Sequence, residues 1–472
     1  MIKSIPHRNR TLRSSLGAHL AGLLLILPLT GAAQEIAAPH DSRLVEGPLT
    51  LRDCIAIALG ESPKLEASRF DLLAATAEIR AEQGKTLPEL TGSAEAELFS
   101  GNPTGKFTVF QSTDTTVIGL PGATKTVNLG ELDIFGAKVR YPVFKDGSIL
   151  GLNNPPAVAA KKAEKEALAW TTHLTREEVI YRITDAFIAT VSAQNREGFV
   201  AHRVGLLEQS VGITQEQQKQ GLALPIDLKL AKDQLNGAQS LSKIIHQQVA
   251  AGRTELAKAL ALPSASSLRL SSTLPEPPEP PRTEQLLNGP LHNHPSLQVQ
   301  RATIDKAKQE YRLERFRLYP SVTLDGSALY VDDFNPPGQH VYTGAITVSV
   351  PIFDFGAQSA TARAKKMTYL AEQARLASVA DDVIYEIVKI YEEIGTLTEG
   401  ILSRQQEVAK GERDWRVASS QQEQGITEPL KVNEAELYLI GKRDELTTLE
   451  ARRLLLYAAL QKATGGAWKW IP

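Results

Sequence analysis

The residue types that carry most enzyme chemistry are few and scattered in this chain. It has one cysteine and nine histidines, and no His-Glu-x-x-His, Cys-x-x-Cys or Gly-x-Gly-x-x-Gly pattern occurs. The stretch from Gly122 to Thr126 ends like a phosphate-binding loop but lacks the glycine before Lys125. His292 and His294 flank an asparagine ahead of a proline, which fits a helix-entry loop better than a metal site. We therefore expect no catalytic site, no cofactor and no metal site.

The single cysteine, Cys54, lies among Leu51, Ile55 and Ala58. We expect its thiol to be a small buried apolar group rather than a nucleophile. A chain with one cysteine forms no internal disulfide, so its stability must come from packing and oligomerisation.

The first 33 residues are typical of a secretory signal peptide. A basic region without acids is followed by an apolar stretch, Leu20 to Leu29, and by small residues, Gly31 to Ala33, that suit cleavage before Gln34. The alternative is a membrane anchor, but the apolar stretch is too short to span a bilayer. The sequence has no cysteine near this position, so lipid attachment there is excluded.

The charge balance gives no reason to expect a nucleic-acid partner. Without residues 1–33 the chain has 52 − 4 = 48 basic residues against 54 acidic ones, a net charge of −6, whereas nucleic-acid binding uses basic surfaces. After the leader no stretch has about 18 consecutive apolar residues, so any insertion into a membrane must use strands.

The sequence contains an internal repeat, in which a series of residues recurs in the same order. The recurring groups are Pro63, Leu65 and Pro88 with Pro295, Leu297 and Pro320 (295 − 63 = 232); Pro142, Phe144 and Gly147 with Pro351, Phe353 and Gly356 (351 − 142 = 209); and Val179, Gly221 and Leu235 with Val383, Gly425 and Leu439 (383 − 179 = 204). The first copy therefore holds 232 − 209 = 23 extra residues between Pro88 and Pro142, and about five more shortly after. A repeat of this length is a structural unit used twice.

Long proline-free runs in each copy predict paired helices. Segments 157–197, 226–261, 357–393 and 430–463 are rich in helix-forming residues, with apolar residues at helical spacing. A helix of about 65 residues would be ~95 Å long, which suggests coiled-coil packing. The pairs Gly221-Leu222 and Gly425-Ile426, each followed closely by a proline, are the expected turns between paired helices.

Alternating segments before each long helix predict four strands. They form two hairpins, 90–143 and 321–350, each with one apolar and one polar face. The loop of the first hairpin, around residues 101–130, holds most of the insertion. Bacterial membrane barrels have at least about eight strands, and an open sheet edge cannot face lipid. The chain must therefore oligomerise, or else its strands are soluble.

These features divide the chain as follows: signal peptide 1–33; first repeat 34–262, with a helical hairpin over 157–262; proline-rich link 263–290; second repeat 291–463, with a helical hairpin over 357–463; and tail 464–472. The link contains Pro275 to Pro281, a stiff extended spacer. We expect Trp468 and Trp470 of the tail to pack beside it.

The duplicated order of these features resembles the TolC-like outer-membrane efflux proteins, or outer membrane factors. The resemblance runs from Leu49 to about Trp470. It is carried by Leu51, Ala56, Ala58, Leu59, Pro63 and Leu65 leading to Pro88, by Pro142-Val143-Phe144 with Gly147, by Pro351-Ile352-Phe353 with Gly356, and by the two glycine turns. It implies a mainly α fold with membrane β-structure: long antiparallel helical hairpins forming an α-barrel or coiled coil, and four strands per chain contributing to a trimeric 12-stranded outer-membrane β-barrel.

The resemblance also implies a function. The homotrimer would be the passive exit duct of a tripartite efflux or type I secretion system, with its barrel among outer-membrane lipid and its helices in the periplasm. A periplasmic adaptor and an inner-membrane transporter of the RND, ABC or MFS type would deliver the substrate. Drugs, metal ions, proteins and small metabolites are all cargoes of this architecture. The tips of the inner hairpins would untwist to open it.

The resemblance assigns candidate residues at both turns. Asp227 follows the first turn, and the equivalent position after the second is Lys431, with Glu434 one helical turn further on. These three are candidates for the periplasmic gate, or else solvated charges on an exposed helix end. Gly221, Leu222, Gly425 and Ile426 are candidates for adaptor docking, since glycine permits close approach and the apolar neighbour offers an anchor; the glycines can equally be helix caps.

Two other classes of protein compete with a channel. A periplasmic coiled-coil adaptor or scaffold is also exported and built on helical hairpins, but it should carry a small lipoyl-like β domain split by one hairpin rather than two strand pairs. An exported enzyme would need a pocket that no motif indicates.

Overall fold

The computed structural model describes residues 47–98, 131–260, 262, 268–274, 276–288, 293–332 and 339–470. The predicted signal peptide and residues 99–130 of the first strand loop lie outside this part of the chain. The structure described below is that of the unit from Pro48 onward.

Four helices make up the first copy: α2 (Leu51–Glu61), α3 (Pro63–Gly84), α4 (Pro156–Lys219) and α5 (Pro225–Ala259). The Thr50 side chain starts α2 because its hydroxyl accepts from the backbone N–H of Asp53, whose carboxylate accepts in turn from the Thr50 N–H. Prolines at the first position start α3, α4 and α5, where a missing N–H costs no hydrogen bond.

The second copy contains α7 (Pro295–Phe316), α8 (Ala357–Glu423) and α9 (Pro429–Ala463), preceded by a short helix, α6 (Thr283–Asn288), that the sequence pattern did not predict. The long helices α4 and α8 have 64 and 67 residues, as expected from the proline-free runs. In the described part of the chain, no helix is long and apolar enough to cross a membrane.

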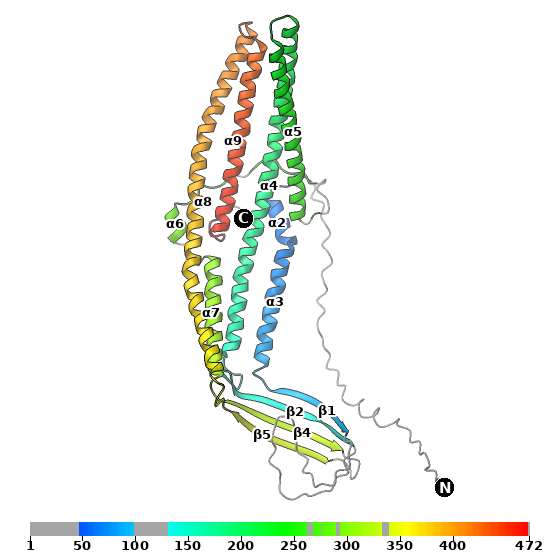
Figure 1. The fold of residues 1–472 in the computed structure, drawn as a ribbon, viewed down its shortest axis with the longest axis vertical. Coiled ribbons are helices and arrows are strands. Elements are labelled where there is room, and N and C mark those ends of the chain that lie inside the picture. Colours follow the sequence, from blue (N-terminus) through cyan, green and yellow to red (C-terminus); the bar gives the residue numbers. More distant parts are fainter. Residues whose placement is uncertain are drawn as a thin grey trace, which may run out of the picture. The chain divides into compact units, whose positions relative to one another are not determined.

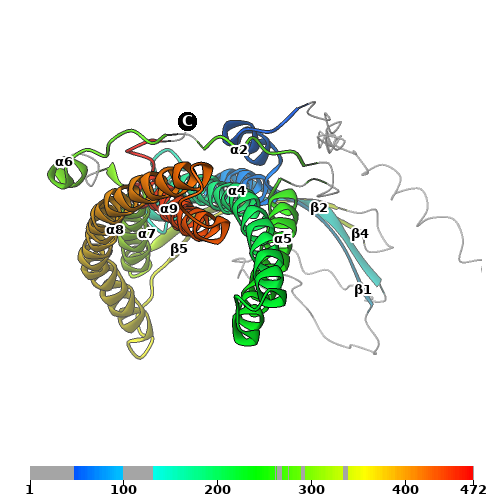
Figure 2. The same cartoon turned by 90° about the horizontal axis from the view of Figure 1, so that it is seen from above.

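The helices form one curved layer in which α4 and α8 run the full length (Figures 1 and 2). In the half that ends in the two turns, the order across the layer is α8, α9, α4, α5. In the half next to the strands, it is α8, α7, α4, α3. The short helices α5 and α3 therefore lie in line beside α4, and α9 and α7 lie in line between α4 and α8.

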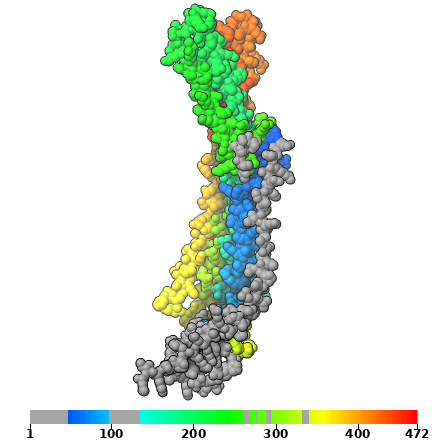
Figure 3. All heavy atoms as spheres, turned by 90° about the vertical axis from the view of Figure 1, so that its right-hand side faces the viewer, coloured from blue at the N-terminus to red at the C-terminus, as the bar shows by residue number. Residues whose placement is uncertain are grey.

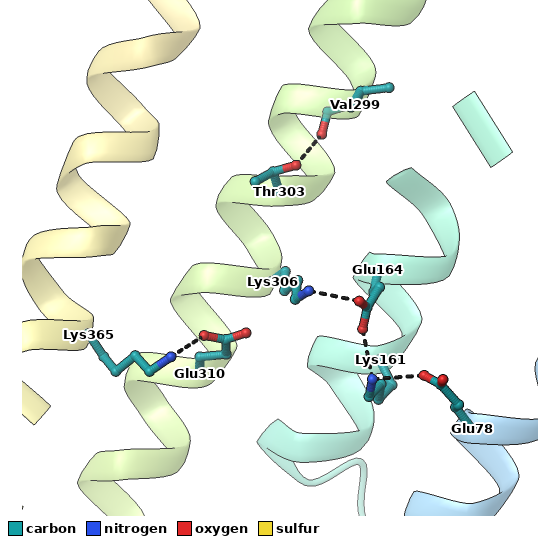
Figure 4. Close-up of polar contacts among 8 residues, drawn as sticks. All are labelled: Glu78, Lys161, Glu164, Val299, Thr303, Lys306, Glu310 and Lys365. Atoms are coloured by element: carbon teal, nitrogen blue, oxygen red, sulfur yellow. Dashed lines mark hydrogen bonds and ion pairs between the residues drawn. The ribbon is translucent and has the colours of Figure 1, made fainter. Parts of the chain in front are cut away.

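Ion pairs cross the lower half of this layer (Figure 4). Lys161 of α4 contacts Glu78 of α3 at 2.8 Å, Lys306 of α7 contacts Glu164 of α4 at 2.8 Å, and Lys365 of α8 contacts Glu310 of α7 at 2.7 Å. The hydrogen bond from Lys306 holds the pKa of Glu164 below its usual value, and Glu78 and Glu164 raise the pKa of Lys161. Partly exposed pairs of this kind add little stability singly, so we read them as fixing helix register.

The strands β1 (Glu89–Leu98), β2 (Glu131–Lys145), β4 (Ser321–Asp332) and β5 (Gln339–Ser349) form one antiparallel sheet in the order β1-β2-β4-β5. The two predicted hairpins are present, and β2 pairs with β4 to join them. A two-residue strand, β3 (Ser148–Ile149), pairs with the end of β2. It lies where the first copy was expected to have about five additional residues.

The registers bring most of the apolar residues of the four strands onto one face of the sheet, although Ile134, Leu329, Val331 and Val341 lie on the other. Leu90 pairs with Val139, and Leu324 pairs with both Tyr141 and Ile346. Because successive side chains alternate between faces, the residues between them form the opposite, polar face; members of that face are Thr91, Ser93, Lys138, Arg140, Thr323, Asp325, Ser327, Thr347 and Ser349. Many apolar side chains of the first face are exposed in the single chain, among them Leu90, Ile346 and Val348.

The core lies midway along the helical layer. One buried cluster joins α2, α4 and the end of α5 around Phe187 and Leu256, and another joins α8 and α9 around Ile387 and Leu460. Trp470 packs on both clusters and, with Leu274, on a third. The tail and the link therefore pack against the same cluster, as expected.

A glycine in α5 tests the packing of the first hairpin. A Cβ at Gly252 would lie 2.6 Å from the Thr190 Oγ1 on α4, whereas a Cβ at Gly237 in the same helix would meet nothing within 4 Å. We expect Gly252→Ala to destabilise the protein by about 1–3 kcal/mol and Gly237→Ala to stabilise it by up to about 1 kcal/mol through helix propensity. Urea unfolding midpoints in detergent measure both; equal midpoints for the two variants would contradict this packing.

Candidate functional site

The two helical turns have the same backbone geometry. In the first tip, residues 220–224 between α4 and α5, Gly221 has a φ of +75°; in the second tip, residues 424–428 between α8 and α9, Gly425 has a φ of +71°. The Leu222 N–H donates to the Gln217 carbonyl at 2.8 Å, and the Ile426 N–H donates to the Gln421 carbonyl at the same distance. Both are glycine-terminated helix caps, so the predicted turns are confirmed as turns.

Each of these glycines is followed by a largely exposed apolar residue. Leu222 and Ile426 are 75% and 68% exposed, and a Cβ at either glycine would meet nothing within 4 Å. Both tips lie at the end of the helical layer opposite the sheet (Figure 1). A surface of this kind, a tight turn with an exposed apolar side chain, can receive another protein without rearrangement.

The three candidate gate residues occupy two different settings. Asp227 and Lys431 both stand third in their helices, α5 and α9. The Asp227 carboxylate accepts the Leu224 N–H at 2.8 Å, so it caps α5 and suits the positive end of a helix. Lys431 puts a positive charge at the same point of α9, where it is unfavourable to the helix dipole.

Lys431 and Glu434 lie together at the second tip, and Asp227 does not join them within the chain. They line a surface pocket of about 480 Å³ with Lys410 and Asp414 of α8 and with Tyr438. Lys431 and Glu434 make no ion pair with described residues. The pocket therefore presents two lysines and two carboxylates to solvent near the tip.

The sequence analysis missed the polar contacts that join the two hairpins. On α4 and α9, the buried Asn433 Nδ2 donates to the Ser210 Oγ at 3.2 Å, and the His202 Nε2 lies 3.1 Å from the Glu436 Oε1. Farther from the tips, the Arg196 guanidinium contacts both carboxylate oxygens of Asp444, at 2.7 and 3.3 Å. These partners lie more than 200 residues apart, so only the fold brings them together.

Another pocket, of about 570 Å³, lies where α9 ends and α7 begins. The His294 Nδ1 accepts the Ser296 N–H and its Nε2 donates to the Ala463 carbonyl at 2.9 Å, and burial lowers the pKa of this histidine. A neutral ring therefore ties the two helices. Buried Glu177 also lines the pocket and accepts from Gln461 at 3.4 Å.

The other candidates for chemistry have structural roles or lie elsewhere. Cys54 is fully buried in the core, and burial raises the pKa of its thiol to about 12, as expected for an apolar packing residue. His292 and the residues from Gly122 to Thr126 lie outside the described part of the chain. Among described residues, no three His, Cys, Asp or Glu side chains are grouped to hold a metal ion.

A family model supports the resemblance inferred from the sequence. Residues 286–466, which include the second half of α6 and all of α7, β4, β5, α8 and α9, match the model of the outer membrane efflux protein family. A comparison with curated proteins found no match.

Solved structures share the fold over nearly the whole chain. The CmeC outer membrane channel of Campylobacter jejuni has a TM-score of 0.72 at 15% identity, covering 89% of this chain and 86% of that one. The open-state MtrE outer membrane channel of Neisseria gonorrhoeae has a TM-score of 0.72 at 16% identity, covering 89% and 90%. The outer membrane protein VceC of Vibrio cholerae has a TM-score of 0.69 at 19% identity, covering 89% and 97%.

The helical layer, the amphipathic sheet and the paired tips make up a fold that this chain shares with solved outer-membrane channels. The match to the outer membrane efflux protein family covers residues 286–466, and the similarity of fold to the two channels with a TM-score of 0.72 covers 89% of the chain. Members of this family are passive channels rather than enzymes, and they sit in the outer membrane with their helical part in the periplasm. The prediction of fold class is thereby confirmed, and the predictions of family, non-enzymatic character and localisation agree with the family that residues 286–466 match.

The contact between Arg196 and Asp444 gives a quantitative prediction for the joint between the hairpins. A two-point, partly buried ion pair should show a coupling free energy of about 1–2 kcal/mol in a double-mutant cycle of Arg196→Ala and Asp444→Ala. The exposed pair of Lys219 and Glu216, three residues apart on α4, is the control and should couple by less than about 0.5 kcal/mol. Unfolding midpoints supply the energies; equal coupling in both cycles would show that the hairpins are not held by this pair.

Proposed function

We propose that three copies of this chain form the outer-membrane exit duct of a tripartite efflux or type I secretion system. The substrate would pass from an inner-membrane transporter of the RND, ABC or MFS type, through a periplasmic adaptor, into the helical stalk. The duct itself performs no chemistry.

The observation that carries this proposal is the amphipathic sheet. Four strands expose an apolar face suited to lipid and a polar face suited to a water-filled lumen. Four strands are too few to close a barrel, and their outer strands β1 and β5 cannot present open edges to lipid. Three copies supply twelve strands, within the range of bacterial barrels, and channels of this family are trimers.

A periplasmic adaptor or scaffold is the weaker alternative. An adaptor or scaffold would account for the helical hairpins, but it would not account for the exposed apolar face of the sheet. Fractionation of cells distinguishes the two proposals. A channel should remain in the outer-membrane fraction after a high-salt wash, whereas an adaptor or scaffold should be absent from that fraction.

We propose further that Lys431 and Glu434 line the periplasmic entrance and that Asp227 braces it. The support is their place directly after the tips and the exposed pocket that the first two share. Charges at a narrow entrance select ions by sign. Asp227 instead caps the start of α5 and so stabilises the turn conformation of the first tip.

Single-channel recording in planar bilayers tests the entrance. We expect Lys431→Glu to shift the reversal potential in a salt gradient toward cation selectivity and Glu434→Lys to shift it toward anions, most clearly at low ionic strength, where charges are less screened. Charge reversal at Asp227 should lower conductance by loosening the first tip. The control is Lys85→Glu, at the sheet end of α3 and far from the tips. If reversal at all three candidate positions leaves conductance and selectivity unchanged, they are solvated charges only.

The tips are proposed as the adaptor-docking sites, through Gly221 with Leu222 and Gly425 with Ile426. Asparagine tolerates the left-handed backbone better than other bulky residues, so it adds volume while keeping the turn. We expect Gly221→Asn and Gly425→Asn to abolish transport in cells while trimers persist in detergent extracts. Leu222→Asp and Ile426→Asp should do the same by removing the apolar anchors.

The control for docking is Leu402→Asp, at a half-exposed apolar position of α8 away from the tips. It should leave transport intact. Normal transport by all four tip variants would mean that the glycines serve only as helix caps.

A further inference from the structure

The pocket of about 570 Å³ where α9 ends and α7 begins is formed within a single chain. Helices α3, α4, α7, α8 and α9 all contribute to its walls. Its volume is in the usual range for sites that bind small molecules, about 300–1,000 Å³. The charges and apolar groups of these walls therefore indicate which ligand the pocket can hold.

The pocket opens on the concave face of the helical layer. Two of its lining residues on α4, Thr171 and Glu178, stand nine residues before Ile180 and Phe187 (180 − 171 = 187 − 178 = 9). Nine residues amount to about two and a half turns, so the two pairs point to opposite sides of α4. Ile180 and Phe187 pack in the cluster that contains α2, and Figure 2 shows α2 on the convex side of the curved layer.

A buried carboxylate, that of Glu177, lies in the wall of this pocket. Glu177 is 2% exposed, yet the hydrogen bond that it accepts from the Gln461 Nε2 is 3.4 Å long. The nearest cation in the described part of the chain, the adjacent Arg176, is 3.7 Å away. Charge-assisted hydrogen bonds are normally about 2.7–2.9 Å long, and a buried charge needs close partners. Glu177 therefore has capacity for a further, closer donor.

The ionisable groups of the walls make the pocket negative overall. Three glutamates and two lysines line it, a net charge of 2 − 3 = −1. One of the lysines, Lys462, already pairs with Glu178. The histidine of the pocket, His294, is neutral because burial lowers its pKa. A cation is thus the favoured type of ligand.

Two exposed charges at the edges of the pocket act in opposite directions. Lys64 is the second residue of α3, which lies along one margin of the layer (blue in Figure 3). Glu386 lies on α8, at the other end of the lining. Neither forms an ion pair with described residues, and both are exposed. Lys64 therefore opposes the binding of a cation and Glu386 favours it, each by a modest amount because solvent screens exposed charges.

Apolar side chains complete the lining. Leu174 of α4 is half-buried, and Val383 of α8 and Ala463 of α9 are buried. Among described residues, no three potential ligand side chains are grouped to hold a metal ion. An apolar wall beside a buried acid fits a molecule with an apolar body and a hydrogen-donating positive group better than a bare ion.

We propose that this pocket binds small amphiphilic amines, with the ammonium group on Glu177 and the apolar body against Leu174 and Val383. The ammonium group supplies the close, charged donor that the Glu177 carboxylate lacks within the chain. The inference rests on the proposed function in one respect: when several copies close a tube, the concave face lies inside it, so the amine reaches the pocket from the duct.

Binding of 2-phenylethylamine to the full-length protein in lipid nanodiscs tests the site. Isothermal titration calorimetry gives the dissociation constant, with empty nanodiscs as the blank. The control ligands are 2-phenylethanol and phenylacetate, which keep the aromatic ring and replace the ammonium by a neutral or a negatively charged group. We expect saturable binding of the amine, with one site per chain, and none of the two controls.

Variants assign the binding to the pocket. Glu177→Gln keeps the shape of the side chain and removes its charge, so it should raise the dissociation constant about tenfold or more. Glu386→Gln should raise it by about two- to fivefold, and Lys64→Gln should lower it by a similar factor. The matched control is Glu208→Gln, at an exposed position of α4 nearer the tips, which should bind like the wild type.

The opposite signs expected at Lys64 and Glu386 keep the test decisive if Glu177→Gln does not fold. Equal dissociation constants for the wild type and all the pocket variants, or equal binding of the amine and the alcohol, would overturn the proposal. Channels of normal conductance that bind no amine would overturn this site alone. Amine binding with the expected variant pattern, by protein that forms no channels in planar bilayers, would overturn the proposed function and leave the site.

Discussion

Backbone hydrogen bonding in lipid is the constraint on which the rest of this structure depends. In the described part of the chain, a four-stranded sheet with one apolar face leaves the N–H and C=O groups along the outer edges of β1 and β5 without strand partners, and a bilayer offers no water to hydrogen-bond to such groups. Strand pairing between neighbouring copies would satisfy these backbone groups without any additional residues. The apolar face and the open edges thus have one explanation, a ring of strands shared among copies.

The helical layer extends this arrangement away from the membrane. Helices of 64 and 67 residues reach about 95–100 Å, with shorter helices filling the layer beside them. Toward the tips, ion pairs and neutral polar contacts connect the hairpins beside buried apolar residues such as Leu206 and Leu439, while the clusters around Phe187 and Ile387 and the link lie at mid-length.

Much of the fold was predictable because its signals are local or repeated. Proline-free runs located the long helices, the alternation of Val322 to Tyr330 located a strand, and the glycines at 221 and 425 located turns whose φ values are positive. The short strand β3 and helix α6 were missed because a few residues carry no periodicity. The contacts of Arg196 with Asp444 and of His294 with Ala463 depend on chain segments far apart in sequence. The repeat offset showed that Asp227 and Lys431 occupy equivalent positions. Only the fold showed that Asp227 caps its helix, whereas Lys431 lines a pocket with Glu434.

The mass of the purified full-length protein in detergent tests the central claim most directly. Light scattering that separates protein from bound detergent should give three times the chain mass, and the protein should precipitate when detergent is removed, because the apolar sheet face is then left without lipid. A species of single-chain mass that stays in solution without detergent would contradict the account.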